Sequence, residues 1–206
     1  MASKLLIIRH GETTWNAAGR MQGQANSPLS DKGIAQAKAM APNFVGRIFK
    51  SVTCSDLDRT VDTARFLGFP DARPEPLWRE IHVGDWSGSY YADIQREHAE
   101  HMNAWFMGEF TPPNAETWWD FVERILSAID LLRGHEADGD TEGTHLVIAH
   151  GLVLKAAICG LSGIDHTRVS GAKNCATAEF ELLGRGHDRM LHYNQSLLND
   201  ATAMAY

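Results

Sequence analysis

Cysteine and long hydrophobic runs are both scarce in this chain of 206 residues. The cysteines, Cys54, Cys159 and Cys175, are scattered, odd in number and without a CxxC pair. This spacing argues against a disulfide framework or a zinc site and favours a reducing cytosol. The apolar run before Arg9 is too short for the core of a signal peptide, and no run approaches the length that spans a bilayer. We therefore expect a cytoplasmic protein without a membrane partner.

A positive net charge is missing too, because aspartate and glutamate outnumber lysine and arginine and leave a net charge of −7. Such a chain is not expected to bind nucleic acid or anionic membranes as a general partner, so an anionic ligand needs positive charge gathered locally. Internal repeats are absent, and the hydrophobic content of 44% is ordinary for a globular protein. The length predicts a single domain over residues 1–206.

Predicted strands and helices alternate along the chain, which is typical of an α/β protein with a mostly parallel sheet. The expected strands cover 4–9, 50–54, 144–149, 176–183 and 189–193, with a short one ending at Leu77 and Trp78. The expected helices cover 31–45, 57–68, 116–133 and 152–160, and irregular segments cover 10–29, 135–143 and 194–206.

The segment 89–115 differs in composition, because it is rich in aromatic residues and contains Pro112-Pro113. We expect it to be an inserted helical cap, whose aromatic side chains either cover a pocket or anchor the cap. The predicted fold is a three-layer α/β/α sandwich with a mostly parallel central sheet and a small helical cap insertion.

Three predicted strands lead into residues suited to phosphate chemistry. The runs 5–8 and 146–149 are apolar, as in buried strands, and histidine and glycine follow each closely. The expected strand 50–54 precedes a helix that carries an arginine. Ligands of α/β folds bind at the C-terminal ends of strands, arginine forks bind phosphate oxygens, and a neutral imidazole can attack phosphorus. The residues expected to meet are Arg9, His10, Arg59 and His150.

The residues alone leave alternatives open. His10 and His150 are equivalent in this pattern, since each follows a strand and precedes glycine. His10 could instead be a buried structural histidine. Arg59 could lie on the surface of its helix and pair with Asp56 or Asp58.

A longer series of motifs resembles the histidine phosphatase superfamily, also called phosphoglycerate mutase-like. The series covers nearly the whole chain, and its order and spacing carry the resemblance. Its members are Leu6-Ile7-Ile8-Arg9-His10-Gly11-Glu12-Thr13, Asn16, Gln22-Gly23, Pro28-Leu29-Ser30, Gly33, Gln36-Ala37, Ser55-Asp56-Leu57, Arg59-Thr60, Thr63-Ala64, Glu80, Gly84, Trp86, Gly88, Glu116-Thr117, Arg124 and Val147-Ile148-Ala149-His150-Gly151.

The resemblance implies a role for each principal residue. His10 is the implied nucleophile, which forms a phosphohistidine. Arg9 and Arg59 are implied to bind the phosphoryl oxygens, together with His150, which would donate best when protonated. Glu80 is the implied general acid, and in the later step it would activate water.

Glu80 has its own alternatives. A carboxyl buried near a phosphate has a raised pKa and can act as an acid, but Glu80 could instead form a salt bridge with Arg79. Asp85 is the rival acid, and Glu12 is expected to support the His10 loop.

The candidates for substrate binding are Asn16, Gln22, Gly23, His82 and Gly151. Asn16 would add a neutral donor to the phosphoryl oxygens, although it could be a simple turn residue. Gln22 and Gly23 resemble the substrate-contacting pair of the family, with a plain turn as the alternative. His82 lies two residues beyond Glu80 and would point from the same strand face into the pocket.

The implied activity is a metal-independent phosphomonoesterase, without a cofactor, that acts on a small phosphorylated metabolite. Segments 20–24 and 84–86 resemble those of small phosphatases that act on glucosyl-3-phosphoglycerate. The alternatives are a cofactor-dependent phosphoglycerate mutase, which usually has longer insertions before the long helix, and a non-catalytic phosphoester-binding module. The oligomeric state stays open between a monomer and a homodimer.

Overall fold

The computed structural model describes residues 2–134 and 143–197. Most of the acidic loop predicted over 135–143, and the end of the tail predicted over 194–206, lie outside these residues.

A six-stranded sheet forms the centre of the described chain, in the order β3-β2-β4-β1-β5-β6. The first four strands of this order are parallel, and β5 and β6 complete the sheet in antiparallel pairing. The fold is therefore α/β with a mostly parallel sheet, as predicted. The strands are β1 (Ser3–Arg9), β2 (Ser51–Cys54), β3 (Arg73–Pro74), β4 (Thr144–Ala149), β5 (Ala176–Leu182) and β6 (Arg189–Ser196).

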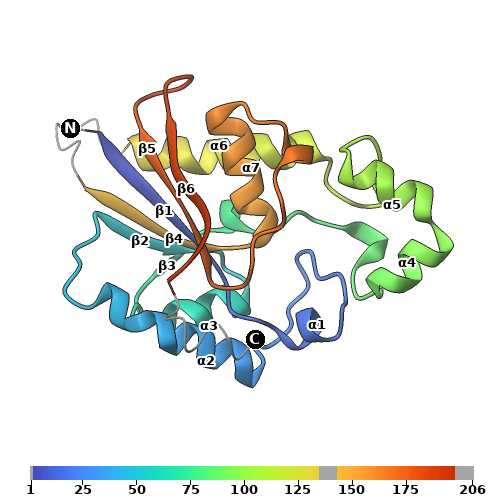
Figure 1. Cartoon of the computed structure of the whole chain (residues 1–206), viewed down its shortest axis with the longest axis horizontal. Helices are drawn as coiled ribbons and strands as arrows, with labels where there is room; N and C mark the ends of the chain where they lie inside the picture. The colour runs from blue at the N-terminus through green and yellow to red at the C-terminus, as the bar shows by residue number, and fades with distance from the viewer. Residues whose placement is uncertain (1, 135–142, 198–206) are drawn as a thin grey trace.

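Helices cover both faces of the sheet, with α6 and α7 on one side and α2 and α3 on the other (Figure 1). None of the described helices is both long enough and apolar enough to cross a membrane. The α-helices are α1 (Thr14–Ala17), α2 (Asp31–Met40), α3 (Asp58–Phe66), α4 (Tyr91–Glu97), α5 (Ala99–Phe106), α6 (Trp118–Gly134) and α7 (Gly151–Ser162), and short 3-10 helices cover Ala41–Phe44, Pro76–Trp78, Gly84–Trp86 and His166–Arg168.

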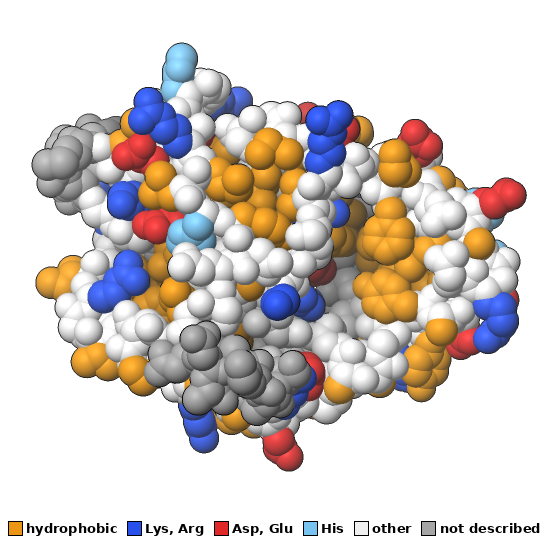
Figure 2. Space-filling model, viewed as in Figure 1, with side chains coloured by type: hydrophobic (Ala, Val, Ile, Leu, Met, Phe, Trp, Pro, Cys, Tyr) orange, Lys and Arg blue, Asp and Glu red, His pale blue; other side chains and the backbone are white. Residues whose placement is uncertain are grey.

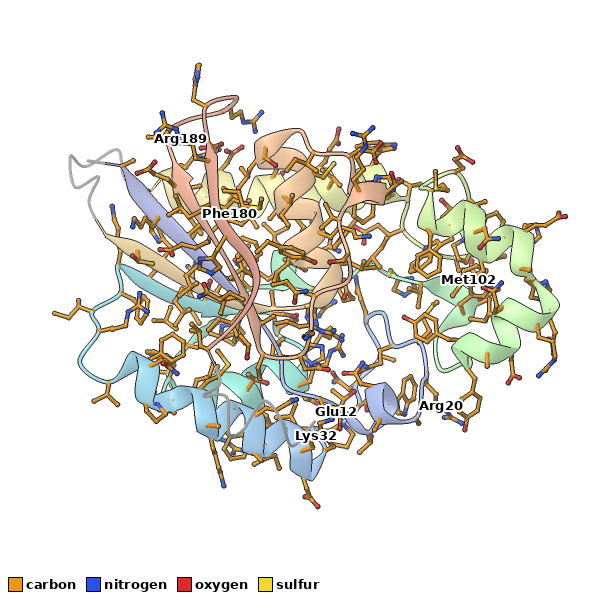
Figure 3. The ribbon with its side chains drawn as sticks, viewed as in Figure 1. Glu12, Arg20, Lys32, Met102, Phe180 and Arg189 are labelled. Atoms are coloured by element: carbon orange, nitrogen blue, oxygen red, sulfur yellow. The ribbon has the colours of Figure 1, made fainter. Side chains whose placement is uncertain are left out.

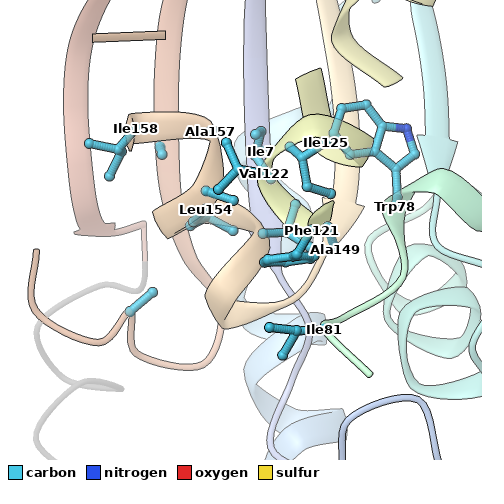
Figure 4. Close-up of a cluster of buried hydrophobic side chains, with 14 of the residues drawn as sticks. Ile7, Trp78, Ile81, Phe121, Val122, Ile125, Ala149, Leu154, Ala157 and Ile158 are labelled. Carbon is cyan, nitrogen blue, oxygen red and sulfur yellow. The ribbon is translucent and has the colours of Figure 1, made fainter. Parts of the chain in front are cut away.

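The three layers follow from the apolar run in β1, because successive side chains of a strand point to opposite faces. Leu5 and Ile7 lie in one hydrophobic cluster with residues of α6 and α7, whereas Leu6 and Ile8 lie in a second cluster with Met40. The central strand β1 is therefore buried on both faces, as parallel strands covered by helices on either side are. Figure 4 labels members of the first cluster from β1, α6, β4 and α7, including Ile7, Phe121, Val122, Ile125, Ala149 and Leu154.

The segment predicted as a helical cap contains α4 and α5, which stand apart from the sheet (Figure 1). Met102, labelled in Figure 3, is buried inside the cap. The Trp86 ring packs against Trp105 and Phe110, with ring centroids 6.0 and 5.7 Å away. These contacts anchor the cap to the segment that follows Glu80.

The structure corrects several predicted boundaries. Leu77 and Trp78 lie in a 3-10 helix and not at the end of a strand, because Pro76 begins a turn in which the Glu75 carboxylate caps the N–H of Leu77. The helix predicted over 31–45 ends at Met40, and a 3-10 helix that contains Pro42 follows it. The predicted loop 10–29 contains α1, and β6 runs to Ser196.

The loop that carries His10 packs with its backbone directly against the first turn of α2. A β-carbon at Gly33 would lie 1.9 Å from the carbonyl oxygen of Glu12, and one at Gly11 would lie 2.5 Å from the carbonyl oxygen of Gly33. Glu12 also contacts this turn through Ser30 and Lys32 (Figure 3). Glycine at both positions therefore fixes the distance between α2 and the His10 loop.

We expect Gly33→Ala to destabilise the protein by about 1–3 kcal/mol, because the added methyl group overpacks this contact. The loop that positions His10 must shift, so turnover should fall as well. Urea unfolding and steady-state kinetics measure the two effects. Gly134→Ala is the matched control, since a β-carbon there would meet nothing within 4 Å among the described residues outside its own turn of α6. Equal stability of the two variants would contradict the prediction.

Candidate active site

The pairing of β1 with β4 brings the two histidines together. Arg9 lies opposite Ala149 in this parallel pair, and the N–H of His10 donates to the carbonyl of Ala149 over 3.0 Å. The imidazole centroids of His10 and His150 are 5.2 Å apart in an edge-on arrangement. Arg59 reaches the same place from α3, as the sequence predicts.

A cavity of about 260 Å³ opens between these strand ends and the cap. Figure 2 shows a hollow there, with hydrophobic side chains of the cap along one side. The predicted residues that line it are Arg9, His10, Asn16, Gln22, Gly23, Arg59, Glu80 and Gly151. His150 lies against His10 behind this lining.

The His10 imidazole is held as one tautomer. Its Nδ1 lies 2.7 Å from the carbonyl oxygen of Gly11, and because a carbonyl only accepts, Nδ1 carries the proton. Nε2 therefore keeps its lone pair. Burial lowers the pKa of His10 well below its usual value, and the positive charges of Arg59 and Arg9 lower it further. The ring is neutral, and Nε2 is available as a nucleophile.

The His150 imidazole has the opposite tautomer. Its Nδ1 accepts a hydrogen bond of 3.2 Å from Nε of Arg59, so the proton of the neutral ring is on Nε2. Burial and the charge of Arg59 lower the pKa of His150 well below its usual value. Nε2 is buried and has no hydrogen-bond partner within the described residues. In this arrangement the neutral His150 ring offers Nε2–H as a donor, whereas the family resemblance implies a donor that acts best when protonated.

Both arginines are fixed by backbone carbonyls. Arg59 is 1% exposed, and its terminal nitrogens donate to Ala25 and Gly23 over 2.8 and 2.7 Å. This placement is incompatible with the surface pairing to Asp56 or Asp58.

Arg9 donates to the carbonyl of Ala172 over 2.5 Å, while its Nε is buried without a hydrogen-bond partner in the described chain. A β-carbon at Gly151 would lie 3.3 Å from this Nε. Gly151 therefore leaves room for the Arg9 guanidinium beside the first turn of α7.

The Glu80 carboxylate meets the N-terminus of α7. One oxygen accepts from the N–H of Leu152 over 3.2 Å and the other from the N–H of Ile81 over 3.0 Å. Burial raises the pKa of Glu80, although these hydrogen bonds and both arginines lower it in part. Arg79 instead pairs with Asp56 through two hydrogen bonds of 2.7 and 2.5 Å, so the alternative salt bridge with Glu80 is absent.

The remaining predicted residues at the cavity are Asn16, Gln22 and Gly23. The Asn16 amide oxygen accepts from the N–H of Thr13 over 3.2 Å, which leaves its NH₂ group as a donor. Gln22 is 8% exposed, and its amide oxygen has no partner within the described residues. Gly23 has a φ of +54°, and a β-carbon there would lie 2.6 Å from Val83, so this turn requires glycine.

Two predicted candidates lie outside the cavity. His82 is exposed, and its Nδ1 accepts from the N–H of Gly84 over 3.2 Å. The predicted strand alternation fails because the chain from Glu80 to Val83 is not a strand. Asp85 is exposed as well and accepts from Asn114 over 3.0 Å.

The structure adds cavity residues that the sequence patterns did not identify. Arg20 and Lys155 bring two further positive charges, and Tyr91, Trp105 and Phe106 contribute aromatic surface from the cap. Of the two roles left open for the cap aromatics, these three line the pocket. Lys155 follows Gly151 at helical i,i+4 spacing, which places both on one face of α7. That spacing was the signal available in the sequence.

The cysteines are not reactive groups of this site. Burial raises the pKa of Cys54 to about 11 and that of Cys175 to about 12, so both thiols are protonated at neutral pH. Within the part of the chain that is described, no group of three or more His, Cys, Asp or Glu side chains could hold a metal ion.

Comparisons with known proteins find relatives over most of the chain. The chain is 32% identical to the glucosyl-3-phosphoglycerate phosphatase of Mycolicibacterium vanbaalenii, over 84% of this chain and 81% of the relative. It is 34% identical to the adenosylcobalamin/alpha-ribazole phosphatase of Salmonella typhimurium, over 77% of this chain and 79% of the relative. A solved mycobacterial glucosyl-3-phosphoglycerate phosphatase in complex with VO3 has a TM-score of 0.83 and 29% identity, and the alignment covers 95% of this chain and all of the other.

The family model described as histidine phosphatase superfamily (branch 1) matches residues 5–195. The match begins in β1 and ends in β6, so it includes both strand ends that carry the histidines. The chain therefore belongs to branch 1 of the histidine phosphatase superfamily and is a hydrolase of the phosphatase type.

Proposed function

We propose that this phosphatase hydrolyses monoesters of small phosphorylated metabolites through a phosphohistidine on His10. The observation that carries the proposal is the tautomer of His10, whose Nδ1 donates to Gly11 and whose Nε2 is free at a cavity with two arginines and Glu80. The relatives are named for glucosyl-3-phosphoglycerate and for alpha-ribazole, which supports a small phosphorylated substrate.

In the first step, Nε2 of His10 attacks phosphorus. The nitrogen–phosphorus bond forms while the bond from phosphorus to the ester oxygen breaks, and Glu80 gives its proton to that oxygen. A phosphoryl transition state spreads negative charge over its equatorial oxygens. Arg9, Arg59 and the Nε2–H of His150 stabilise this charge, because they are held in place before the reaction.

In the second step, water replaces the alcohol. The Glu80 carboxylate, which has lost its proton, takes one from water as the water oxygen attacks phosphorus. The bond to His10 breaks, phosphate leaves, and Glu80 is protonated again for the next turnover. The raised pKa of Glu80 suits both roles, since the carboxyl must gain and lose a proton near neutral pH.

Release of phosphate from p-nitrophenyl phosphate tests the proposal. A purified chain that turns this ester over without a bisphosphate primer is a phosphatase and not a primer-dependent mutase. No turnover of any phosphomonoester would overturn the proposal and favour a phosphoester-binding module.

We expect EDTA to leave the rate of this reaction unchanged, because arginines supply the positive charge that a metal ion would otherwise provide. Steady-state rates before and after dialysis against EDTA measure the effect, with a zinc-dependent phosphatase treated in parallel as the control. If activity is lost after dialysis and one divalent ion restores it, the metal-free mechanism is wrong.

A further inference from the structure

The catalytic cavity extends beneath the cap. A smaller pocket shares five lining residues with it and adds Phe110, Trp118 and His166. The shared residues are Ile81, Trp105, Phe106, Leu152 and Lys155. The extension itself holds only about 20 Å³, so the alcohol portion of a substrate held at His10 would occupy the main cavity of about 260 Å³, whose wall includes Lys155.

Lys155 lies at the junction of the two pockets. It follows Gly151 by four residues on α7, so its Cα is about 6 Å further along the helix axis. The carboxylate of Glu80 binds the N–H of Leu152, in the first turn of the same helix. Three groups therefore follow one another along α7. Arg9 lies beside Gly151, Glu80 binds the N–H of Leu152, and Lys155 comes next.

The Lys155 ammonium has no ion pair or hydrogen bond within the described residues, unlike the other cations nearby. Arg20 donates to the Tyr90 hydroxyl over 3.1 Å and lies 4.5 Å from the centre of its ring, and Arg124 pairs with Glu116 at 2.7 Å. Burial lowers the pKa of Lys155, and no neighbouring carboxylate opposes this effect. A partly buried ammonium without a counter-ion suits an anion supplied by a ligand.

The extension beneath the cap offers a donor as well. Trp118 is 9% exposed, and its Nε1–H has no hydrogen-bond partner in the described chain. Its ring stacks on His166 with centroids 4.5 Å apart. Burial lowers the pKa of His166, although Asp165, 3.7 Å away, and the carbonyls of Phe106 and Met107 raise it in part. Among the described residues that line this smaller pocket, Lys155 is the one lysine or arginine.

We propose that Lys155 is a specificity-determining residue, which binds a carboxylate carried by the leaving alcohol of the substrate. Beneath the cap, Lys155 is the one lysine or arginine among the described lining residues, and a single ammonium there matches one carboxylate better than the two charges of a second phosphate. The physiological substrate is then a phosphomonoester of a hydroxy acid or of a derivative that keeps the acid group. This inference rests on the proposed function, since the carboxylate is placed relative to a phosphoryl group at His10.

Two esters of matched size test the inference. In 3-phosphoglycerate a carboxylate stands where glycerol 3-phosphate has a hydroxymethyl group. We expect the wild-type chain to have the higher kcat/KM for 3-phosphoglycerate, and Lys155→Met to reduce the ratio of the two values about 10- to 100-fold, because a hydrogen bond to a charged group is lost. Lys155→Arg should keep most of the ratio. Lys38→Met, the same change at an exposed position on α2, should keep all of it.

The outcomes separate this inference from the proposed function. If the wild-type chain hydrolyses p-nitrophenyl phosphate but shows no preference for 3-phosphoglycerate, the inference is wrong and the proposed function stands. The same holds if Lys155→Met leaves the ratio unchanged. If no ester is hydrolysed, both fail. If Lys155→Met does not fold, Lys155→Gln supplies the ratio instead, and an absent preference in the wild-type chain still overturns the inference.

Discussion

Replacement of His10 by alanine should reduce turnover of every phosphomonoester by a factor on the order of 10⁵–10⁶, as loss of a nucleophile does in other covalent enzymes. The loss is chemical, because alanine has no lone pair to attack phosphorus, and the arginines that bind the phosphoryl group remain. Steady-state kinetics with p-nitrophenyl phosphate measure it. His187→Ala, the same change at an exposed turn, should have the activity of the unaltered chain.

The intermediate itself can be trapped. The wild-type chain, mixed with substrate and denatured at alkaline pH to preserve the nitrogen–phosphorus bond, should show one phosphate on the peptide that contains His10. Mass spectrometry of the digested protein locates it. The tautomers favour this result, since Nε2 of His10 has a free lone pair whereas Nε2 of His150 carries a proton. A phosphate on His150 would reverse the assignment.

These tautomers illustrate what the sequence could and could not predict. The apolar runs before His10 and His150 predicted two buried parallel strands, and strand geometry predicted that the histidines meet. The pattern left the two equivalent, because histidine and glycine follow each strand. The difference comes from the partner of each Nδ1, because that of His10 is its neighbour Gly11, whereas that of His150 is Arg59, which lies far away in the sequence on another element.

Local patterns failed where a turn replaced regular structure. The prediction that His82 shares a face with Glu80 assumed strand alternation, but the chain there bends with Gly84 at a φ of +54°. Asn114 in the turn before α6 takes a φ of +61°, a left-handed conformation that asparagine tolerates and that no local pattern predicted.

Lys155 escaped prediction for a different reason. Its spacing from Gly151 was visible, but a lysine on a helix usually faces solvent. Only the cap, which folds from a segment without a strong periodic pattern, turns this position into the wall of a pocket.

Glu80→Gln should reduce the rate of hydrolysis most for the substrates whose leaving group most needs a proton. An alkoxide is a poor leaving group and requires the acid, whereas p-nitrophenolate leaves without much help. General acid catalysis typically contributes 10²–10⁴-fold, so the chemical step with alkyl phosphates should slow by about that factor. Glutamine keeps the shape of the side chain and an oxygen that can accept from the N–H of Leu152 or Ile81, which makes a loss through misfolding small.

The same variant should reveal the second role of Glu80. With p-nitrophenyl phosphate, phosphorylation of His10 stays fast but hydrolysis of the phosphohistidine slows, because no carboxylate takes the proton from water. Stopped-flow absorbance should then record a burst of nitrophenolate equal to the enzyme concentration, followed by a slow steady state. Asp85→Asn is the matched control, and it should behave as the wild-type chain does, since Asp85 is exposed outside the cavity. Equal losses for alkyl and nitrophenyl esters without a burst would remove Glu80 from the chemistry, and a dependence on leaving group in Asp85→Asn would transfer the acid role to Asp85.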